Sequence, residues 1–178
     1  PLIADIHFDY RLALAALEAG IDGLRLNPGN ISDPRQIAAV VKSARARQVP
    51  IRIGVNAGSL PKKPARGSVA QRMVAAALEQ IDLLESLDFN LIKISLKAFD
   101  VPTTIEAYRL MARKTVYPLH LGITEAGLPR EGAIRSAVGI GILLHEGIGD
   151  TIRVSLTADP REEVVTGYET VSYTHLRA

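Results

Sequence analysis

Hydrophobic and polar positions alternate with a period of two residues along six short segments rich in Ile, Leu and Val. These predicted strands lie near residues 2–7, 23–27, 50–56, 91–97, 118–124 and 151–157. Stretches rich in Ala and Leu with helical spacing separate them, near residues 10–19, 34–47, 69–87, 103–115, 130–146 and 160–171. Regular alternation of strand and helix predicts βα units around a parallel sheet, in the α/β class.

The predicted helix ends carry their own local patterns. Asp33-Pro34 and Asp159-Pro160 each place an N-cap residue before a proline at the first helical position. Gly20 and Gly147 follow helical stretches, where a left-handed C-cap residue is expected. The loop 61–67, which holds Lys62, Lys63 and Arg66, is interpreted as a solvated surface excursion.

Each predicted strand has one apolar face and one polar or small face. The polar sets are Asp5 and His7; Arg25 and Asn27; Arg52, Gly54 and Asn56; Lys93, Ser95 and Lys97; His120, Gly122 and Thr124; and Arg153, Ser155 and Thr157. Strands covered by helices on both faces are almost wholly apolar, so an open sheet covered on both sides does not fit this pattern.

A closed barrel does fit, because every inward face then points at a common axis. An open sheet of six strands would scatter the same residues over roughly 25 Å, at about 4.8 Å per strand. The sequence therefore predicts part of a (β/α)8 TIM barrel, with six βα units and a site at the carboxyl ends of the strands. We expect the two remaining units to be missing from the N-terminal side.

The amino-acid composition excludes several classes of protein and kinds of site. The 178 residues are 47% hydrophobic and 22% charged, which is typical of one globular domain. The absence of cysteine excludes disulfides, thiolate zinc and an iron–sulfur site within the chain. No apolar run is long enough for a membrane span, so we expect a cytoplasmic location with no membrane partner. A net charge of +2 and 4% aromatic residues do not favour a nucleic-acid partner.

The predicted inward face is strongly cationic. It carries Arg25, Arg52, Lys93, Lys97 and Arg153. Cations at this density repel one another unless an anion lies among them, and Arg suits bidentate contact with phosphate. Small loops at 27–30 and 56–59 would let backbone N–H groups approach the same ligand. We therefore predict a small polyanionic ligand, with more than one phosphate.

Other readings stay open at this point. His7 and His120 can equally be core residues, and no pattern for a metal site, a nucleophilic serine or a Walker A loop occurs. Another phosphate-handling barrel, such as a pterin- or thiamine-type synthase, is possible. An aldolase would need Lys93 or Lys97 as its Schiff-base amine. A stand-alone anion-binding module is the non-enzymatic alternative.

Several strings together resemble one family of enzymes. They are ADIHFDYR at 4–11, LRLNPGN at 24–30, PIRIGVNAGS at 50–59, PLHLGITEAG at 118–127, GIGDTIRVSL at 147–156 and ADP at 158–160. In this order they resemble the 4-hydroxy-3-methylbut-2-enyl diphosphate synthases of the methylerythritol phosphate pathway of isoprenoid biosynthesis. The resemblance runs from residue 1 to about residue 169.

The resemblance implies a TIM-barrel domain that binds 2-C-methyl-D-erythritol 2,4-cyclodiphosphate, followed by a separate domain with a [4Fe–4S] cluster. It also implies a homodimer, reduced by flavodoxin or ferredoxin, that converts this substrate to the linear diphosphate. Glu125 would be the catalytic proton donor or hydroxyl partner. The substrate-binding residues would be His7, Arg25, Asn27, Arg52, Asn56, Lys97, Thr124, Arg153 and Ser155.

The chain also departs from the family. Phe99 stands where the family usually has Ser, in Lys-Ala-Phe-Asp at 97–100. We expect residues 1–170 to be a barrel domain truncated at its N-terminal side, 171–178 to be a tail foreign to the family, and the iron–sulfur domain to lie outside this sequence. Accordingly, we expect these 178 residues alone to bind no metal or cluster and to be inactive.

Overall fold

Six βα units follow one another in the computed structural model, which describes residues 1–27, 31, 33–60 and 67–175. The strands are β1 (Ile3–Ile6), β2 (Gly23–Leu26), β3 (Ile51–Asn56), β4 (Ile92–Lys97), β5 (His120–Leu121) and β6 (Thr151–Ile152). The helices are α1 (Tyr10–Glu18), α2 (Pro34–Ala46), α3 (Val69–Ser86), α4 (Val101–Ala112), α5 (Pro129–His145) and α6 (Pro160–His175), with a short 3-10 turn at Ala57–Ser59.

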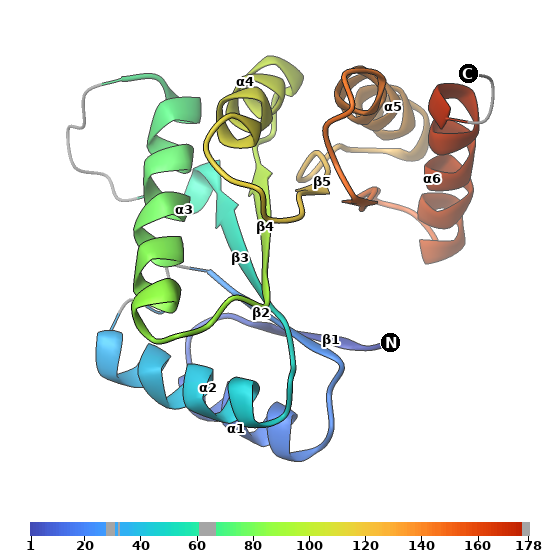
Figure 1. The fold of residues 1–178 in the computed structure, drawn as a ribbon. Helices are drawn as coiled ribbons and strands as arrows, with labels where there is room; N and C mark the ends of the chain where they lie inside the picture. The colour runs from blue at the N-terminus through green and yellow to red at the C-terminus, as the bar shows by residue number, and fades with distance from the viewer. Residues whose placement is uncertain (28–30, 32, 61–66, 176–178) are drawn as a thin grey trace.

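The strands are parallel and neighbour one another in chain order. One sheet has the order β1-β2-β3-β4, and β5 pairs with β6. A bridge between Ile94 and Leu119 joins the two sheets, with the Ile94 amide donating to the Pro118 carbonyl at 2.9 Å. The strands thus form an arc with the helices around its outside (Figure 1). This arrangement confirms the predicted α/β class and is consistent with a partial barrel.

The apolar face of each long strand packs against the helices. The buried strand residues on this face are Leu24, Leu26, Ile51, Ile53, Val55, Ile92, Ile94 and Leu96. They meet buried helix residues such as Ile37, Met73 and Met111 in one continuous core. The opposite strand face is therefore free to carry polar groups, as the period-two pattern predicts.

The helix limits agree with prediction to within a few residues. Asp33 caps α2 by accepting from the Arg35 amide at 2.8 Å, and Asp159 accepts from the Arg161 amide at 2.9 Å. Gly20 and Gly147 have φ of 83° and 73°, the left-handed conformation expected at a C-cap. One helix begins earlier than predicted, at Val101 instead of 103, because Asp100 caps it through the Thr103 amide.

The last two strands are much shorter than predicted. The prediction of strands over 118–124 and 151–157 is wrong beyond His120–Leu121 and Thr151–Ile152. The chain turns at Thr124 and Glu125, and Glu125 has a φ of 50°, which does not fit a strand. Residues 28–30 and 61–66, including Lys62, Lys63 and Arg66, lie outside the described residues, so the predicted loops there are not assessed.

A buried tyrosine hydroxyl ties α4 to the sheet. Tyr108 is fully buried; its hydroxyl accepts from the Leu96 amide at 3.0 Å and donates to the His120 carbonyl. Burial raises the pKa of Tyr108, since the ionised form cannot be hydrated there. The hydroxyl therefore satisfies two backbone groups on neighbouring strands β4 and β5.

We expect Tyr108→Phe to lower the free energy of unfolding by about 2–3 kcal/mol, because it leaves a buried N–H and C=O without partners. Urea denaturation measures the change. Tyr117→Phe is the matched control: its hydroxyl donates to Glu85 at the surface, 2.8 Å away, and its loss should cost less than about 0.5 kcal/mol. Equal effects of the two variants would contradict the proposed bracing role.

Within the described residues, no helix is both long and apolar enough to cross a membrane.

Candidate anion-binding site

Four charged residues stand side by side across the first four strands. The strand register aligns Asp5 with Arg25, Arg25 with Arg52, and Arg52 with Lys93. The same register aligns Asn56 with Lys97, four residues nearer the carboxyl ends of β3 and β4. Neighbouring like charges in a sheet destabilise it, so this row has a cost that a bound anion would offset.

Arg25 is held in place although it is almost completely buried. Its Nη1 donates to Asp5 Oδ1 at 2.8 Å, and its Nη2 donates to the Gly54 carbonyl at 3.2 Å. Burial acts to raise the pKa of Asp5, but the hydrogen bond and charge of Arg25, with His7 and Arg52, outweigh it and lower that pKa. Glycine at 54 is required, because a Cβ there would overlap Arg25 Nε.

Asn27 is positioned by the turn after β3. Its Nδ2 donates to Ser59 Oγ at 3.1 Å, and Ser59 Oγ lies 3.0 Å from the Asn56 carbonyl. Asn27 is 3% exposed, so this network orients an amide within a buried polar layer. Asn56 itself is half-buried at the end of β3.

Lys97 is a buried ammonium group surrounded by other cations. It is 5% exposed. Burial lowers its pKa well below the ordinary value, and the charges of Arg52, Arg153 and Arg25 lower it further. Gly122 leaves room for it: a Cβ on that residue would lie 3.1 Å from Lys97 Cε. Among the described residues, Lys97 forms no ion pair with a carboxylate.

Arg52 and Arg153 complete the cationic group, which we call the cationic basin (Arg25, Arg52, Lys97 and Arg153). Burial lowers the pKa of Arg52, and the charges of Arg25 and Arg153 add to this effect. In the described part of the chain, Arg52 Nε is buried with no hydrogen-bond partner. Arg153 is exposed and follows β6, yet its charge acts on both Arg52 and Lys97.

The remaining predicted site residues lie at the rim. The Thr124 amide donates to the Ala98 carbonyl at 3.1 Å, which places this turn beside the end of β4. Glu125 follows it with an exposed side chain. His7 is exposed, with Nε2 3.7 Å from Asp5 Oδ2. Ser155 is half-buried after β6, and no hydrogen bond joins it to another predicted site residue in the described chain.

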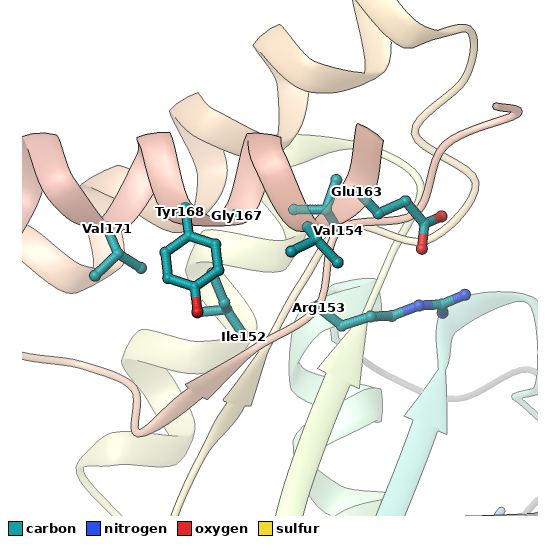
Figure 2. A pocket seen from close by; sticks show the side chains of 8 residues that line it. Ile152, Arg153, Val154, Glu163, Gly167, Tyr168 and Val171 are labelled. Carbon is teal, nitrogen blue, oxygen red and sulfur yellow. The ribbon is translucent and has the colours of Figure 1, made fainter. Parts of the chain in front are cut away.

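A separate hollow lies along β6 and α6. It has a volume of about 390 Å³ and is lined mainly by apolar groups from Ile152, Val154, Val164, Tyr168 and Val171. Arg153 and Glu163 also line it, and Figure 2 shows the Arg153 guanidinium directed away from Tyr168. Arg25, Arg52 and Lys97 are not among the lining residues, so the hollow is distinct from the cluster of cations on β2, β3 and β4.

The structure gives the surroundings of Phe99 and His120, which the sequence left open. Phe99 is 59% exposed and stacks under the Arg135 guanidinium, 5.6 Å from the ring centroid. The sequence assigned no role to Ser59 or Tyr108, and nothing in their spacing marks them. His120, left open between core and ligand roles, is buried among the cations.

The arrangement can bind an anion, but it does not fit a metal cluster. Among the described residues, no group of three His, Cys, Asp or Glu side chains is placed to hold a metal ion, and the sequence has no cysteine. Parallel strands with helices on one face and Arg and Lys side chains on the other define a domain of the α/β-barrel class.

Comparison with known proteins gives the family. Residues 1–168 match the family described as the GcpE TIM-barrel domain. The chain belongs to this family, and its fold is part of a TIM barrel.

Three similar curated proteins share one name, 4-hydroxy-3-methylbut-2-en-1-yl diphosphate synthase (flavodoxin). The protein from Dehalococcoides mccartyi strain CBDB1 is 67% identical over 178 residues, covering 99% of this chain and 51% of the relative. The Geobacter sulfurreducens protein is 59% identical, with the same coverage of 99% and 51%. The Pseudomonas putida F1 protein is 55% identical, covering 100% and 49%. The chain thus spans about half the length of these relatives.

Proposed function

We propose that this chain is the substrate-binding part of a 4-hydroxy-3-methylbut-2-enyl diphosphate synthase of isoprenoid biosynthesis. The substrate would be 2-C-methyl-D-erythritol 2,4-cyclodiphosphate, whose two phosphate groups carry the negative charge that the cationic basin lacks. The observation that supports this most is Lys97, an ammonium buried among guanidinium groups with no carboxylate partner in the described chain. Such a group is costly unless an anion binds there.

In this proposal each residue has a limited task. The diphosphate is bound by the four residues of the cationic basin, Arg25, Arg52, Lys97 and Arg153. Neutral hydrogen-bond donors at the same depth in the site orient it. The neutral donors and rim contacts are His7, Asn27, Asn56, Thr124 and Ser155. Asp5 and the Gly54 carbonyl fix the position of the Arg25 side chain before the ligand binds. Part of the entropic cost of ordering this side chain is therefore met by folding and not by binding. The exposed carboxyl group of Glu125, at the rim, supplies a proton to the leaving oxygen.

We propose that the rest of the machinery lies outside this chain. Two further βα units would cover the open side of the arc between β1 and α6 (Figure 1). Exposed apolar residues line both margins of that opening: Leu2, Ile3 and Leu12 near β1, and Val164 and Tyr168 on α6. A [4Fe–4S] cluster in another domain would supply the electrons, delivered by flavodoxin as the relatives' names state, in a homodimer.

The experiment for this function uses the whole protein that contains this chain. With reduced flavodoxin, it should convert the cyclic diphosphate to the linear diphosphate, detected by mass spectrometry. Saturable, salt-sensitive binding of the cyclic diphosphate is expected as well. A protein that binds no diphosphate would contradict the proposal. Trapping of Lys93 or Lys97 by borohydride with a carbonyl substrate would favour the aldolase alternative.

The role of Glu125 gives a separate prediction. Glu125→Gln should lower kcat about 100-fold, the range of general acid catalysis, and change KM by no more than about threefold. Glu131→Gln, on the first turn of α5, is the control and should leave both constants unchanged. A rise in KM without a change in kcat would assign Glu125 to binding and not to proton transfer.

A further inference from the structure

His120 is a buried histidine beside the cationic basin, and its two ring nitrogens have different surroundings. It lies on β5 and is 8% exposed. Its Nδ1 lies 2.9 Å from Thr151 Oγ1 on the neighbouring strand β6. In the part of the chain that the structure describes, its Nε2 is buried and has no hydrogen-bond partner. A buried ring nitrogen without a partner costs free energy, so it calls for an explanation.

The groups around the imidazole are almost all cationic. Four positive charges act on the ring: those of Lys93 and Lys97 on β4, of Arg52 on β3, and of Arg153 after β6. From α4, the Tyr108 hydroxyl reaches the backbone carbonyl of His120 and not its ring. Asp5, a carboxylate whose charge acts on Arg52 and Lys97, is itself bonded to Arg25.

We propose that His120 is a further binding residue of this site: its Nε2 contacts an oxygen of the bound polyanion, and the imidazole takes up a proton from solvent as the anion binds. The inference rests on the proposed function, since the bound group is taken to be a diphosphate. The anchor at Thr151 suits both protonation states. A threonine hydroxyl can donate to a bare Nδ1 and can also accept from Nδ1–H.

The electrostatics give the direction of the proton. In the protein without its anion, burial first, and then the charges of Lys97, Arg52, Lys93 and Arg153, lower the pKa of His120 to about 2. The ring is therefore neutral at pH 7. An anion among these cations cancels their field and adds an attractive partner, which raises the pKa. The imidazolium then donates from Nδ1 to Thr151 and from Nε2 to the anion.

The test is calorimetry of inorganic pyrophosphate binding to the whole protein, in two buffers of different ionisation enthalpy. His120→Gln sets an amide near the Nε2 position but cannot titrate. We expect the His120→Gln variant to bind pyrophosphate with an affinity within about threefold of the wild type. On binding, it should take up fewer protons per site than the wild type, by at most one. His120→Asn retains only a group near Nδ1, and we expect about tenfold weaker binding from the lost charge-assisted hydrogen bond.

Protonation of pyrophosphate itself is common to all variants, so the difference between them reports His120. His145→Gln, an exposed position on α5, is the matched control and should behave as the wild type. Proton NMR of the wild-type histidine ring gives a readout without mutation: its C2 proton should move toward the imidazolium position when pyrophosphate is added. The His120→Gln spectrum identifies that resonance.

The outcomes separate the two proposals. A wild type that binds pyrophosphate, with both His120 variants unchanged in affinity and proton uptake and with no shift of the ring resonance, overturns this inference alone. A wild type with no saturable binding of pyrophosphate or the cyclic diphosphate overturns the proposed function and this inference with it. Weaker binding by His120→Asn together with reduced proton uptake in both variants supports it.

Discussion

Lys97→Met in the whole protein is expected to lower kcat/KM for the cyclic diphosphate about 1,000-fold, which corresponds to roughly 4 kcal/mol for a buried charge contact. Lys97 is buried, and its charge is placed among other cations with no carboxylate partner in the described residues. A bound anion would therefore supply the counter-charge that this ammonium group lacks. Methionine has a similar shape without the charge, so the fold should accept it.

The same substitution should stabilise the protein in the absence of substrate. Removing a buried, unpaired charge is expected to raise the free energy of unfolding by about 1–3 kcal/mol. Because the folded-state pKa of Lys97 lies below its unfolded value, the unfolded chain binds more protons, and wild-type stability should rise with pH up to about 10.5, the ordinary lysine value. The Lys97→Met variant should lose this slope.

Thermal unfolding at several pH values, with and without pyrophosphate, measures both effects. Lys93→Met is the control: Lys93 shares the strand face but is only half-buried, and its loss should change kcat/KM less than about tenfold. If Lys97→Met destabilised the protein and left substrate binding intact, Lys97 would be a structural residue, and the main support for the proposed function would be lost.

Gly54→Ala should be the second severe change. A Cβ at residue 54 would overlap Arg25 Nε and lie 3.1 Å from Arg25 Cδ and Cζ. Arg25 would have to leave its position between Asp5 and the Gly54 carbonyl, and its charge would lose both partners. We expect kcat/KM to fall about 300-fold, and the free energy of unfolding to fall by about 2–3 kcal/mol.

A second glycine substitution separates this effect from a general intolerance of alanine. A Cβ at Gly141, within α5, would meet only Thr174 Cγ2 at 3.5 Å, an ordinary contact. Gly141→Ala should leave activity unchanged and stabilise the helix by up to about 1 kcal/mol. The measurements are steady-state kinetics and urea denaturation. Normal kinetics for Gly54→Ala would show that Arg25 has room to move or does not contact substrate.

The period-two pattern predicted which polar residues lie inside the fold better than it predicted the lengths of the strands. Arg25, Asn27 and Lys97 were selected by their parity, and they are among the buried polar residues of the structure. Parity depends only on the local pleat, so it holds wherever a strand exists. It failed beyond Leu121 and Ile152, where the composition still resembles a strand but the backbone leaves the sheet. Strand length depends on pairing with neighbours, which a single sequence does not report.

The contacts that orient the site were not predictable for a similar reason. Ser59 reaches Asn27 across 32 residues of sequence, and Tyr108 reaches the backbone of two strands from α4. Neither contact leaves a spacing pattern in the chain. Asp5 was placed on the polar face of the first strand, but its bond to Arg25 depends on the strand register. Sequence therefore indicated which groups gather, and the fold determines which of them touch.

The Tyr108 hydroxyl also has a consequence for how ligand binding in this domain can be altered. The phenol belongs to α4 in the outer helical layer, yet its hydroxyl holds backbone atoms of Leu96 and His120. Leu96 is followed by the basin residue Lys97, and His120 carries the buried imidazole. Tyr108 thus sets the spacing between β4 and β5 from the helical side of the sheet. Substitutions in α4 that shift this phenol by a fraction of an ångström should retune ligand selectivity without altering any ligand-contacting residue, which makes that helix a remote target for directed evolution.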